Sequence, residues 1–341
     1  MYIGLFLLLV VTLFLPLLSE KVEHNIELFL FLVGTTAAVI SKNLSLVFLL
    51  DILSNKFIYM IGFAVLAGGI LFNLFSEYVK AIIGFVLKRV PIRVFAFFLI
   101  IFLGIISSII TAIIAALVLV EIVNLLPLSR KKRIGLTIIS CFSIGLGAVL
   151  TPVGEPLATV VISKLGTSFW YLYNLIGRSV LLSIVCLALF GAWYVKEDTF
   201  SEKETKYDGI EEETYKDILV RTVKIVVFVI ALELLGAGFK PIIDNYVINL
   251  SSKYLYWINI SSAVLDNATL ASAEISTKMS QEQIKAVLLG LLISGGMLIP
   301  GNIPNIISAN KLKIKSSEWI KLAVPLGAVM LVFFFIILFF I

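Results

Sequence analysis

The chain has 341 residues, of which 60% are hydrophobic and 14% are charged, and its formal net charge is +5. A soluble domain is about half apolar and a quarter charged, so this composition excludes a soluble globular protein. The apolar residues fall in long runs, not in short alternating segments, which predicts an all-α polytopic membrane protein surrounded by a lipid bilayer. The single histidine, His24, excludes a His-rich metal site and a His-based catalytic triad.

Ten apolar runs predict helices in chain order. They cover residues 1–18, 26–40, 57–75, 92–126, 134–165, 168–194, 217–238, 254–277, 284–312 and 318–341. Two amphipathic runs, 44–53 and 77–90, predict helices at the membrane interface. About 20 residues cross a bilayer, so runs 92–126 and 134–165 are too long for one span and must break, fold back or protrude.

Basic residues at both ends of run 92–126 indicate its orientation. Lys88, Arg89 and Arg93 lie at its start, and a basic cluster at 130–133 follows its end. Cytoplasmic loops are rich in Lys and Arg, so both ends are expected in the cytoplasm and the run is expected to be a re-entrant hairpin. Counting from there gives eight spans and two hairpins. Both termini are then outside, and the polar segment 195–216 is cytoplasmic.

Three sequence segments recur in the same order in the two halves of the chain. SSIITAIIAALVLVEI (107–122) resembles SSAVLDNATLASAEI (261–275), PVGEP (152–156) resembles PGNIP (300–304), and KLGTSFW (164–170) resembles KLKIKSSEW (311–319). The loop count places the copies in opposite orientations, which is the inverted-repeat architecture of many secondary transporters. The expected parts are peripheral helices 1–56, repeat 1 (57–194, hairpin 92–126, broken helix 134–165), linker 195–216 and repeat 2 (217–341, hairpin 254–277, broken helix 284–312).

Prolines predict an interruption in the same helix of each half. Pro152 and Pro156 flank Gly154, and Pro300 and Pro304 flank Gly301. A proline inside a helix removes a hydrogen bond and costs roughly 3 kcal/mol. Non-helical backbone at membrane depth persists only where protein or a watery cavity satisfies it. The alternative is a pair of plain kinks. The hairpin tips, expected at similar depth, are polar and offer Ser107, Ser108, Thr111, Ser261, Ser262, Asp266, Asn267 and Thr269.

Five carboxylates lie inside the apolar runs: Glu121, Glu155, Glu233, Asp266 and Glu274. Each costs about 2.5–3.5 kcal/mol at the centre of a membrane helix, so each is a functional candidate. Glu155 lies in the first interruption and Asp266 at the second hairpin tip, and both are expected to act in transport. Glu121 and Glu274 fit an interfacial ion pair as well as a role in transport, and Glu233 is expected at the surface. No lysine or arginine lies at the centre of the interruptions or tips, although helix N-termini could hold an anion.

Two of these segments resemble a known family. SSAVLDNATLA (261–271) and LTPVGEPLATVV (150–161) are similar to the hairpin and the broken helix of the ion transporter superfamily. That superfamily includes NhaD-type sodium/proton antiporters, arsenite permeases, and sodium-coupled dicarboxylate and citrate carriers. The resemblance covers about 57–194 and 217–341 and implies ion-site positions at Asp266, Asn267, Thr151 and Glu155. It also implies a homodimer and elevator-like motion of a transport domain.

The chain departs from the family pattern at three places. Its first tip lacks the Asn and the acid of the second, and its second interruption carries Asn302 and Asn305 but no carboxylate. The Ser-Asn-Thr tips of the dicarboxylate carriers are absent from both hairpins. These departures favour a cation as the substrate.

Together these features predict a secondary transporter of a small cation in the cytoplasmic membrane, most closely a sodium/proton antiporter and not an enzyme. Na⁺ and H⁺ would compete for Glu155 and Asp266, with neutral oxygens from Asn267, Thr151, Asn302 and Asn305. Ser107, Ser108, Thr111, Gly154, Ser262, Thr269 and Gly301 would line the same site. No resident cofactor and no nucleic acid are expected. An anion or organic-acid carrier of the same fold, an intramembrane enzyme and a membrane scaffold remain as alternatives.

Overall fold

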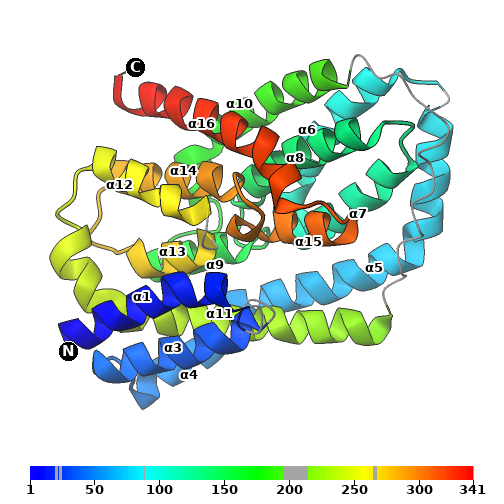
Figure 1. Ribbon diagram of the computed structural model, residues 1–341. Coiled ribbons are helices and arrows are strands. Elements are labelled where there is room, and N and C mark those ends of the chain that lie inside the picture. The colour runs from blue at the N-terminus through cyan, green and yellow to red at the C-terminus, as the bar shows by residue number, and fades with distance from the viewer. Residues whose placement is uncertain (20–21, 23–24, 88, 196–213, 264–266, 341) are drawn as a thin grey trace.

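A computed structural model describes residues 1–19, 22, 25–87, 89–195, 214–263 and 267–340, and all regular structure in these residues is helical (Figure 1). Within the described residues, four helical stretches are long and apolar enough to cross a membrane: Leu46–Phe75, Ile92–Ile110, Tyr171–Tyr194 and Ser316–Phe340. By length and composition, the chain is therefore an all-α membrane protein. Other apolar helices, such as Ile26–Ile40, Ala112–Leu125 and Pro156–Leu165, have 10–17 residues and are shorter than a full span.

The helices of the first half are α1 (Tyr2–Leu18), α3 (Ile26–Ile40), α4 (Leu46–Ser54), α5 (Lys56–Leu87), α6 (Ile92–Ile110), α7 (Ala112–Leu125), α8 (Arg130–Ala148), α9 (Pro156–Leu165) and α10 (Tyr171–Tyr194). Those of the second half are α11 (Tyr215–Ile242), α12 (Ser252–Ile258), α13 (Asn267–Glu274), α14 (Gln281–Gly295), α15 (Ile303–Lys311) and α16 (Ser316–Phe340). A π-helical turn (Ile243–Val247) extends α11, and 3₁₀ turns follow α12 (Asn259–Ala263) and precede α15 (Ile299–Gly301).

Two expectations differ from these bounds. The runs at 57–75 and 77–90 were expected as separate helices, but they form the single helix α5, because no proline or glycine lies between them to end it. The run at 254–277 was expected as one helical hairpin. Its first arm instead consists of the seven-residue α12 and a 3₁₀ turn, and its second arm is α13.

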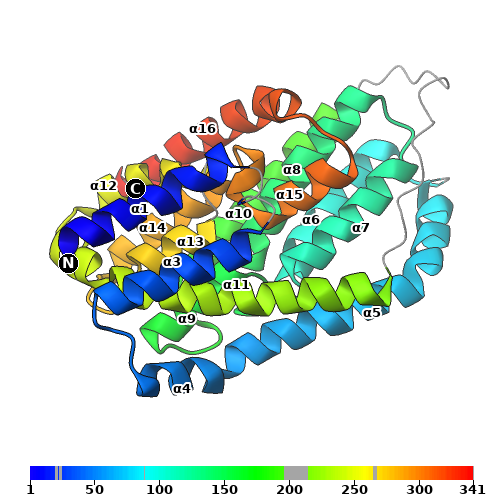
Figure 2. The ribbon, with the colours of Figure 1, turned by 60° about the horizontal axis from the view of Figure 1, so that its bottom comes forward.

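Long helices form two sides of the molecule, and four short helices lie between them. α11 packs along α3 and α5 on one side, and α6, α8 and α10 pack together on the other (Figures 1 and 2). The short helices α7, α9, α13 and α15 fill the space between these sides. They pack in two matching sets. α7 contacts α5 and α15, whereas α13 contacts α11 and α9.

Side-chain hydrogen bonds give the direction of the helices around the first hairpin. The Ser143 hydroxyl donates to the Ile100 carbonyl at 2.9 Å, and the Thr151 hydroxyl donates to the Ser108 carbonyl. The earlier residue of α6 thus contacts the earlier residue of α8, and the later residue of α6 contacts a residue just after α8, so α6 and α8 run parallel. α7 must therefore return between them, and the turn is at Thr111, whose φ of 76° is unusual for a β-branched residue.

The second half has comparable contacts. The Ser294 hydroxyl donates to the Asn259 carbonyl at 2.6 Å, and a Cβ on Gly290 would lie 2.6 Å from the Tyr256 carbonyl oxygen. α12 and its 3₁₀ turn thus run parallel to α14, as α6 does to α8. One contact is duplicated closely: Ser107 donates to the Ile144 carbonyl at 3.0 Å, and Ser262 donates to the Leu291 carbonyl at 3.1 Å.

Candidate functional site

The first helix interruption lies between α8 and α9 and is held by the tip of the α6–α7 turn. The Ala112 amide donates to the Gly154 carbonyl at 2.8 Å, and the Thr151 hydroxyl donates to the Ser108 carbonyl. These bonds satisfy backbone groups that the lost helical turn leaves open, as a buried helix end requires. Ser107, Ser108, Thr111, Thr151 and Gly154 are thereby brought together, as the sequence predicted; all are buried.

The second interruption lies between α14 and α15 and is held largely by its own side chain. The Asn305 amide donates to the carbonyls of Gly295 and Leu298, both at 2.9 Å. The second tip closes over it, since a Cβ on Gly301 would lie 2.6 Å from the Ser262 carbonyl oxygen. The predicted residues Ser262, Gly301, Asn302 and Asn305 therefore form a second buried group.

The two interruptions match each other residue by residue. A Cβ on Gly154 would lie 1.9 Å from the Ala148 carbonyl oxygen, and one on Gly301 would lie 2.6 Å from the Gly295 oxygen, six residues back in both cases. Each glycine precedes an extended residue that begins the next helix, Glu155 at α9 and Asn302 at α15. The structure thus pairs Glu155 with Asn302. This differs by one residue from the pairing of PVGEP with PGNIP, because the backbone contact is anchored on the glycines and not on the prolines.

Polar contacts join the second interruption to α8. The Asn302 Nδ2 atom lies 2.3 Å from the position that a Cβ would take at Gly145, so only a glycine there admits the amide. The Cys141 thiol lies 3.5 Å from the Pro304 carbonyl oxygen and 3.4 Å from the Ser308 hydroxyl. Both interruptions therefore belong to one buried polar region along α8.

Several predicted ligands are buried. Glu155 is 2% exposed, and Asn305 is fully buried. Among the described residues, Asn305 Oδ1 and the amide nitrogen of Asn267 are buried without a hydrogen-bond partner. Buried polar atoms are seldom left in this state, so these two are candidates to meet a ligand. Thr269, also predicted, is buried on α13, and Asp266 lies outside the described residues.

Helix ends give this region both signs of potential. α7 and α9 begin beside each other, because Ala112 bonds to Gly154, and α6 and α8 end at the same place. N-termini attract anions and C-termini attract cations. In the described part of the region, the Glu155 carboxylate at the start of α9 adds a negative charge, which favours a cation over an anion.

The remaining carboxylates of the apolar runs lie away from the interruptions. Glu121 is half-buried on α7, and Glu274 accepts a hydrogen bond from the Asn259 amide at 2.9 Å. The expectation that Glu233 lies at the surface is wrong. Its side chain is only 8% exposed, because α11 continues past it to Ile242 and α4 and α9 cover it.

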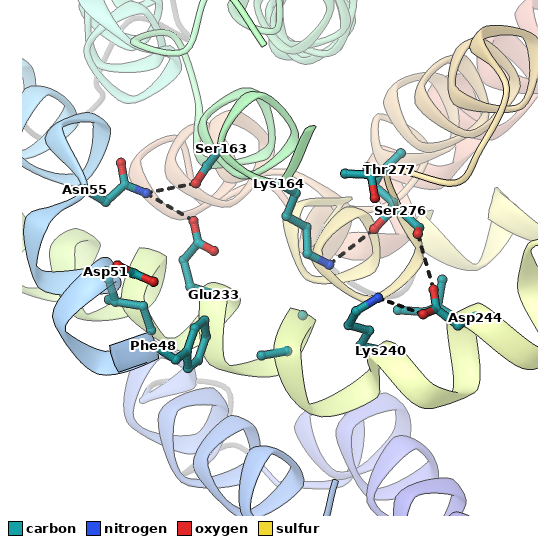
Figure 3. Close-up of a pocket in the computed structure, with 15 residues that line it drawn as sticks. Phe48, Asp51, Asn55, Ser163, Lys164, Glu233, Lys240, Asp244, Ser276 and Thr277 are labelled. Atoms are coloured by element: carbon teal, nitrogen blue, oxygen red, sulfur yellow. Dashed lines mark hydrogen bonds and ion pairs between the residues drawn. The ribbon is translucent and has the colours of Figure 1, made fainter. Parts of the chain in front are cut away.

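Glu233 lines a cavity of about 350 Å³ at the far end of α9, together with Asn55, Ser163 and Lys164 (Figure 3). This set was not predicted from the sequence. Lys164 begins one of the repeated segments, which was a signal of its position, but nothing in the sequence placed Asn55 beside it. At the rim, Asp244 pairs with Lys240 at 2.7 Å and Lys278 at 3.0 Å. Partial burial raises the pKa of Asp244, but the hydrogen bonds to the two lysines outweigh it and lower the pKa below its usual value.

The profile of a family described as a protein of unknown function (DUF1646) matches residues 2–341. A search of the curated proteins finds no match.

Proposed function

The chain belongs to the DUF1646 family, and from its own residues we propose that it is a secondary active transporter of a small cation, most closely a sodium/proton antiporter. The observation that carries the proposal is Glu155, a carboxylate 2% exposed at a helix interruption within an apolar membrane chain. Ionisable residues at membrane depth are costly and mark ion pathways.

The neighbours of Glu155 support a hard cation as its ligand. Hydroxyl and amide oxygens surround the interruptions, from Ser108, Thr111, Thr151, Asn302 and Asn305. Carboxylate and neutral oxygens are the ligands that hard cations such as Na⁺ prefer. In this proposal Asn305 Oδ1, which has no partner among the described residues, is one of the neutral ligands. Asn267 and Asp266 complete the site.

Exchange follows from competition at one group. A carboxylate out of water is stable when it holds a proton or when a cation lies beside it, but it does not hold both well. Release of one ion to one side then makes room for the other. The Glu155 and Asp266 carboxylates are the exchanging groups in this proposal, and the matched contacts of the two interruptions support an inverted repeat. The proposed orientation is both termini outside and segment 195–216 in the cytoplasm.

The second candidate is an anion or organic-acid carrier of the same fold. The adjoining N-termini of α7 and α9 are the observation that favours it, since backbone amides at helix starts bind anions. Against it, Glu155 already places a negative charge at the start of α9. We therefore rank the cation first.

The test is ion flux in proteoliposomes that contain the purified chain, with a pH-sensitive dye inside. Na⁺ added outside is expected to drive proton movement, and Glu155→Gln is expected to abolish it while the protein remains monodisperse. Asp266→Asn is expected to do the same. Glu282→Gln, at an exposed position in the first turn of α14, is the matched control and should transport normally. Normal flux in both central variants would contradict the proposal, and uptake of a dicarboxylate instead would favour the second candidate.

A further inference from the structure

The cavity at the end of α9 is lined by several ionisable side chains. It is lined by α4, the end of α9, α11 and the segment after α13. Five of its lining residues are ionisable: Asp51, Lys164, Glu233, Lys240 and Asp244. Figure 3 shows Asp51, Asn55 and Glu233 on one side of the cavity and Lys164, Lys240 and Asp244 on the other. The cavity therefore has an acidic side and a side with fixed ammonium groups.

On the acidic side, Glu233 is buried among neutral partners. The Asn55 amide lies 3.4 Å from Glu233 Oε1 and donates to the Ser163 hydroxyl at 2.9 Å. Within the described residues Glu233 forms no ion pair, although Lys164 lies in the same cavity. A buried carboxylate needs a compensating charge or a full set of hydrogen bonds. The oxygens of Glu233 and Ser163, facing a cavity, are suited to hold a cation that comes from solution.

On the other side, Lys164 is fixed in place by backbone. Its ammonium donates to the carbonyls of Ser272 and Ile275, the second at 3.3 Å, at the C-terminal end of α13. Its stem packs over Gly236, where a Cβ would lie 2.6 Å from the lysine Cε atom. A helix C-terminus favours a cation, so the ammonium stays on these carbonyls and forms no ion pair with Glu233, although its charge acts on Glu233 across the cavity.

The remaining charges of the cavity do not neutralise Glu233 either. Lys240 and Lys278 both pair with Asp244 at the rim. Asp51 is exposed on α4 and adds negative potential on the acidic side. A cleft lined by one sign of charge raises the local concentration of the opposite ion. The acidic side of this cavity thus favours small cations, while Lys164 prevents them from binding tightly.

We propose that Glu233, with Asn55 and Ser163, is an entry site for the transported cation on the membrane face where α9 ends, and that Lys164 sets its affinity. This rests on the proposed cation transport. α9 has 10 residues and therefore spans about 15 Å, half of a hydrocarbon core of about 30 Å. An ion at Glu233 is thus separated from Glu155, at the other end of α9, by about half the membrane. In this proposal, ions that enter from one membrane face pass the Glu233 site, whereas ions from either face reach Glu155.

The experiment compares the two faces of the membrane. Na⁺-driven proton flux is measured in right-side-out and inside-out vesicles from cells that express the full chain. Glu233→Gln keeps the shape of the side chain and is expected to raise the KM for Na⁺ about tenfold or more on one face only, with the maximal rate unchanged, because the charge that attracts the ion is lost. Lys164→Met keeps the stem over Gly236 and is expected to lower the KM on the same face.

Two further variants separate charge from folding. Lys164→Arg keeps the positive charge and is expected to retain the wild-type KM, and Glu282→Gln, far from the cavity lining, is expected to change neither face. If Glu233→Gln and Lys164→Met change the KM for Na⁺ equally on both faces, or on neither, the proposed entry site is wrong. A loss of maximal rate with unchanged KM, which is the result of a purely structural role, would overturn it as well. Cation flux that still depends on Glu155 would leave the proposed function standing in those cases, whereas wild-type vesicles without any cation flux would overturn both proposals.

Discussion

The two helix interruptions share a backbone but differ in their chemistry. Each has a buried glycine against a carbonyl six residues earlier, followed by an extended residue that begins a short helix. At the matched position the first carries Glu155 and the second carries Asn302. The backbones of the two interruptions are thus similar, and a difference at one position makes the first charged and the second neutral.

The interruptions also differ in what holds them. The first depends on its hairpin, through the bonds from Ala112 to Gly154 and from Thr151 to Ser108. The second depends on Asn305, which bonds back to Gly295 and Leu298 within its own segment. The charged half is therefore coupled to the α6–α7 hairpin, while the neutral half is braced by itself. Substitutions at the matched glycines test the backbone that the two interruptions share, and substitutions at the side chains that differ test the rest.

The largest expected effect comes from filling the space at the matched glycines. In Gly154→Ala, the new Cβ would lie 1.9 Å from the Ala148 carbonyl oxygen, and in Gly301→Ala it would lie 2.6 Å from the oxygens of Gly295 and Ser262. Both contacts are with backbone, which cannot turn aside, so we expect losses of about 3 and about 2 kcal/mol in the free energy of unfolding. Thermal unfolding in detergent measures them.

The control for this prediction is Gly4→Ala on α1, where the nearest atoms to a Cβ lie at 3.8 Å. Alanine is favoured over glycine inside a helix, so this variant should be unchanged or slightly more stable. Wild-type stability of Gly154→Ala would mean that the interruption does not have the close approach on which the comparison depends.

These residues also show what the sequence could predict. The prolines and glycines predicted both interruptions, and the hydroxyls of Ser107, Ser108 and Thr151 were expected beside the first, because local patterns carry that information. The predicted alignment of the two interruptions differs from the structure by one residue, because it paired the prolines, whereas the equivalent backbone contacts are at Gly154 and Gly301. Such a contact depends on atoms six residues apart across a broken helix, which spacing alone does not reveal.

The cavity shows what the sequence could not predict. Asn55 lies more than a hundred residues before Ser163 in the sequence, and Glu233 lies seventy residues after it. The packing of α4 and α9 on α11 brings the three side chains together. The burial of Glu233 depends on that packing and not on its position near the end of an apolar run. Long-range packing of this kind leaves no periodic signal in one sequence.

An intermediate effect is expected from the groups that hold each interruption. Asn305→Ala removes two hydrogen bonds and leaves the carbonyls of Gly295 and Leu298 without that donor, which should cost about 1.5 kcal/mol. Thr159→Val, at the first interruption, removes one bond to the Pro152 carbonyl at 2.6 Å and should cost about 1 kcal/mol. Unfolding in detergent again gives both values. If Thr159→Val proves the more damaging variant, the second interruption is not braced by Asn305 as described.

The smallest effect, and the sharpest for function, is expected from giving the neutral half the charge of the other. The Asn302 side chain makes no capping hydrogen bond to α15, and Asp has nearly the same shape as Asn, so Asn302→Asp should preserve the start of α15. It places a second carboxylate at the position that matches Glu155, and an additional acidic oxygen favours divalent ions such as Ca²⁺. We expect Ca²⁺ to inhibit Na⁺-driven flux at about tenfold lower concentration than in the wild type, a difference of about 1.4 kcal/mol. Asn310→Asp, exposed near the end of the same helix, adds the same charge away from the site and should leave Ca²⁺ inhibition unchanged. Equal inhibition in the two variants would show that Asn302 does not face the ion and that the matched backbone positions do not share one site.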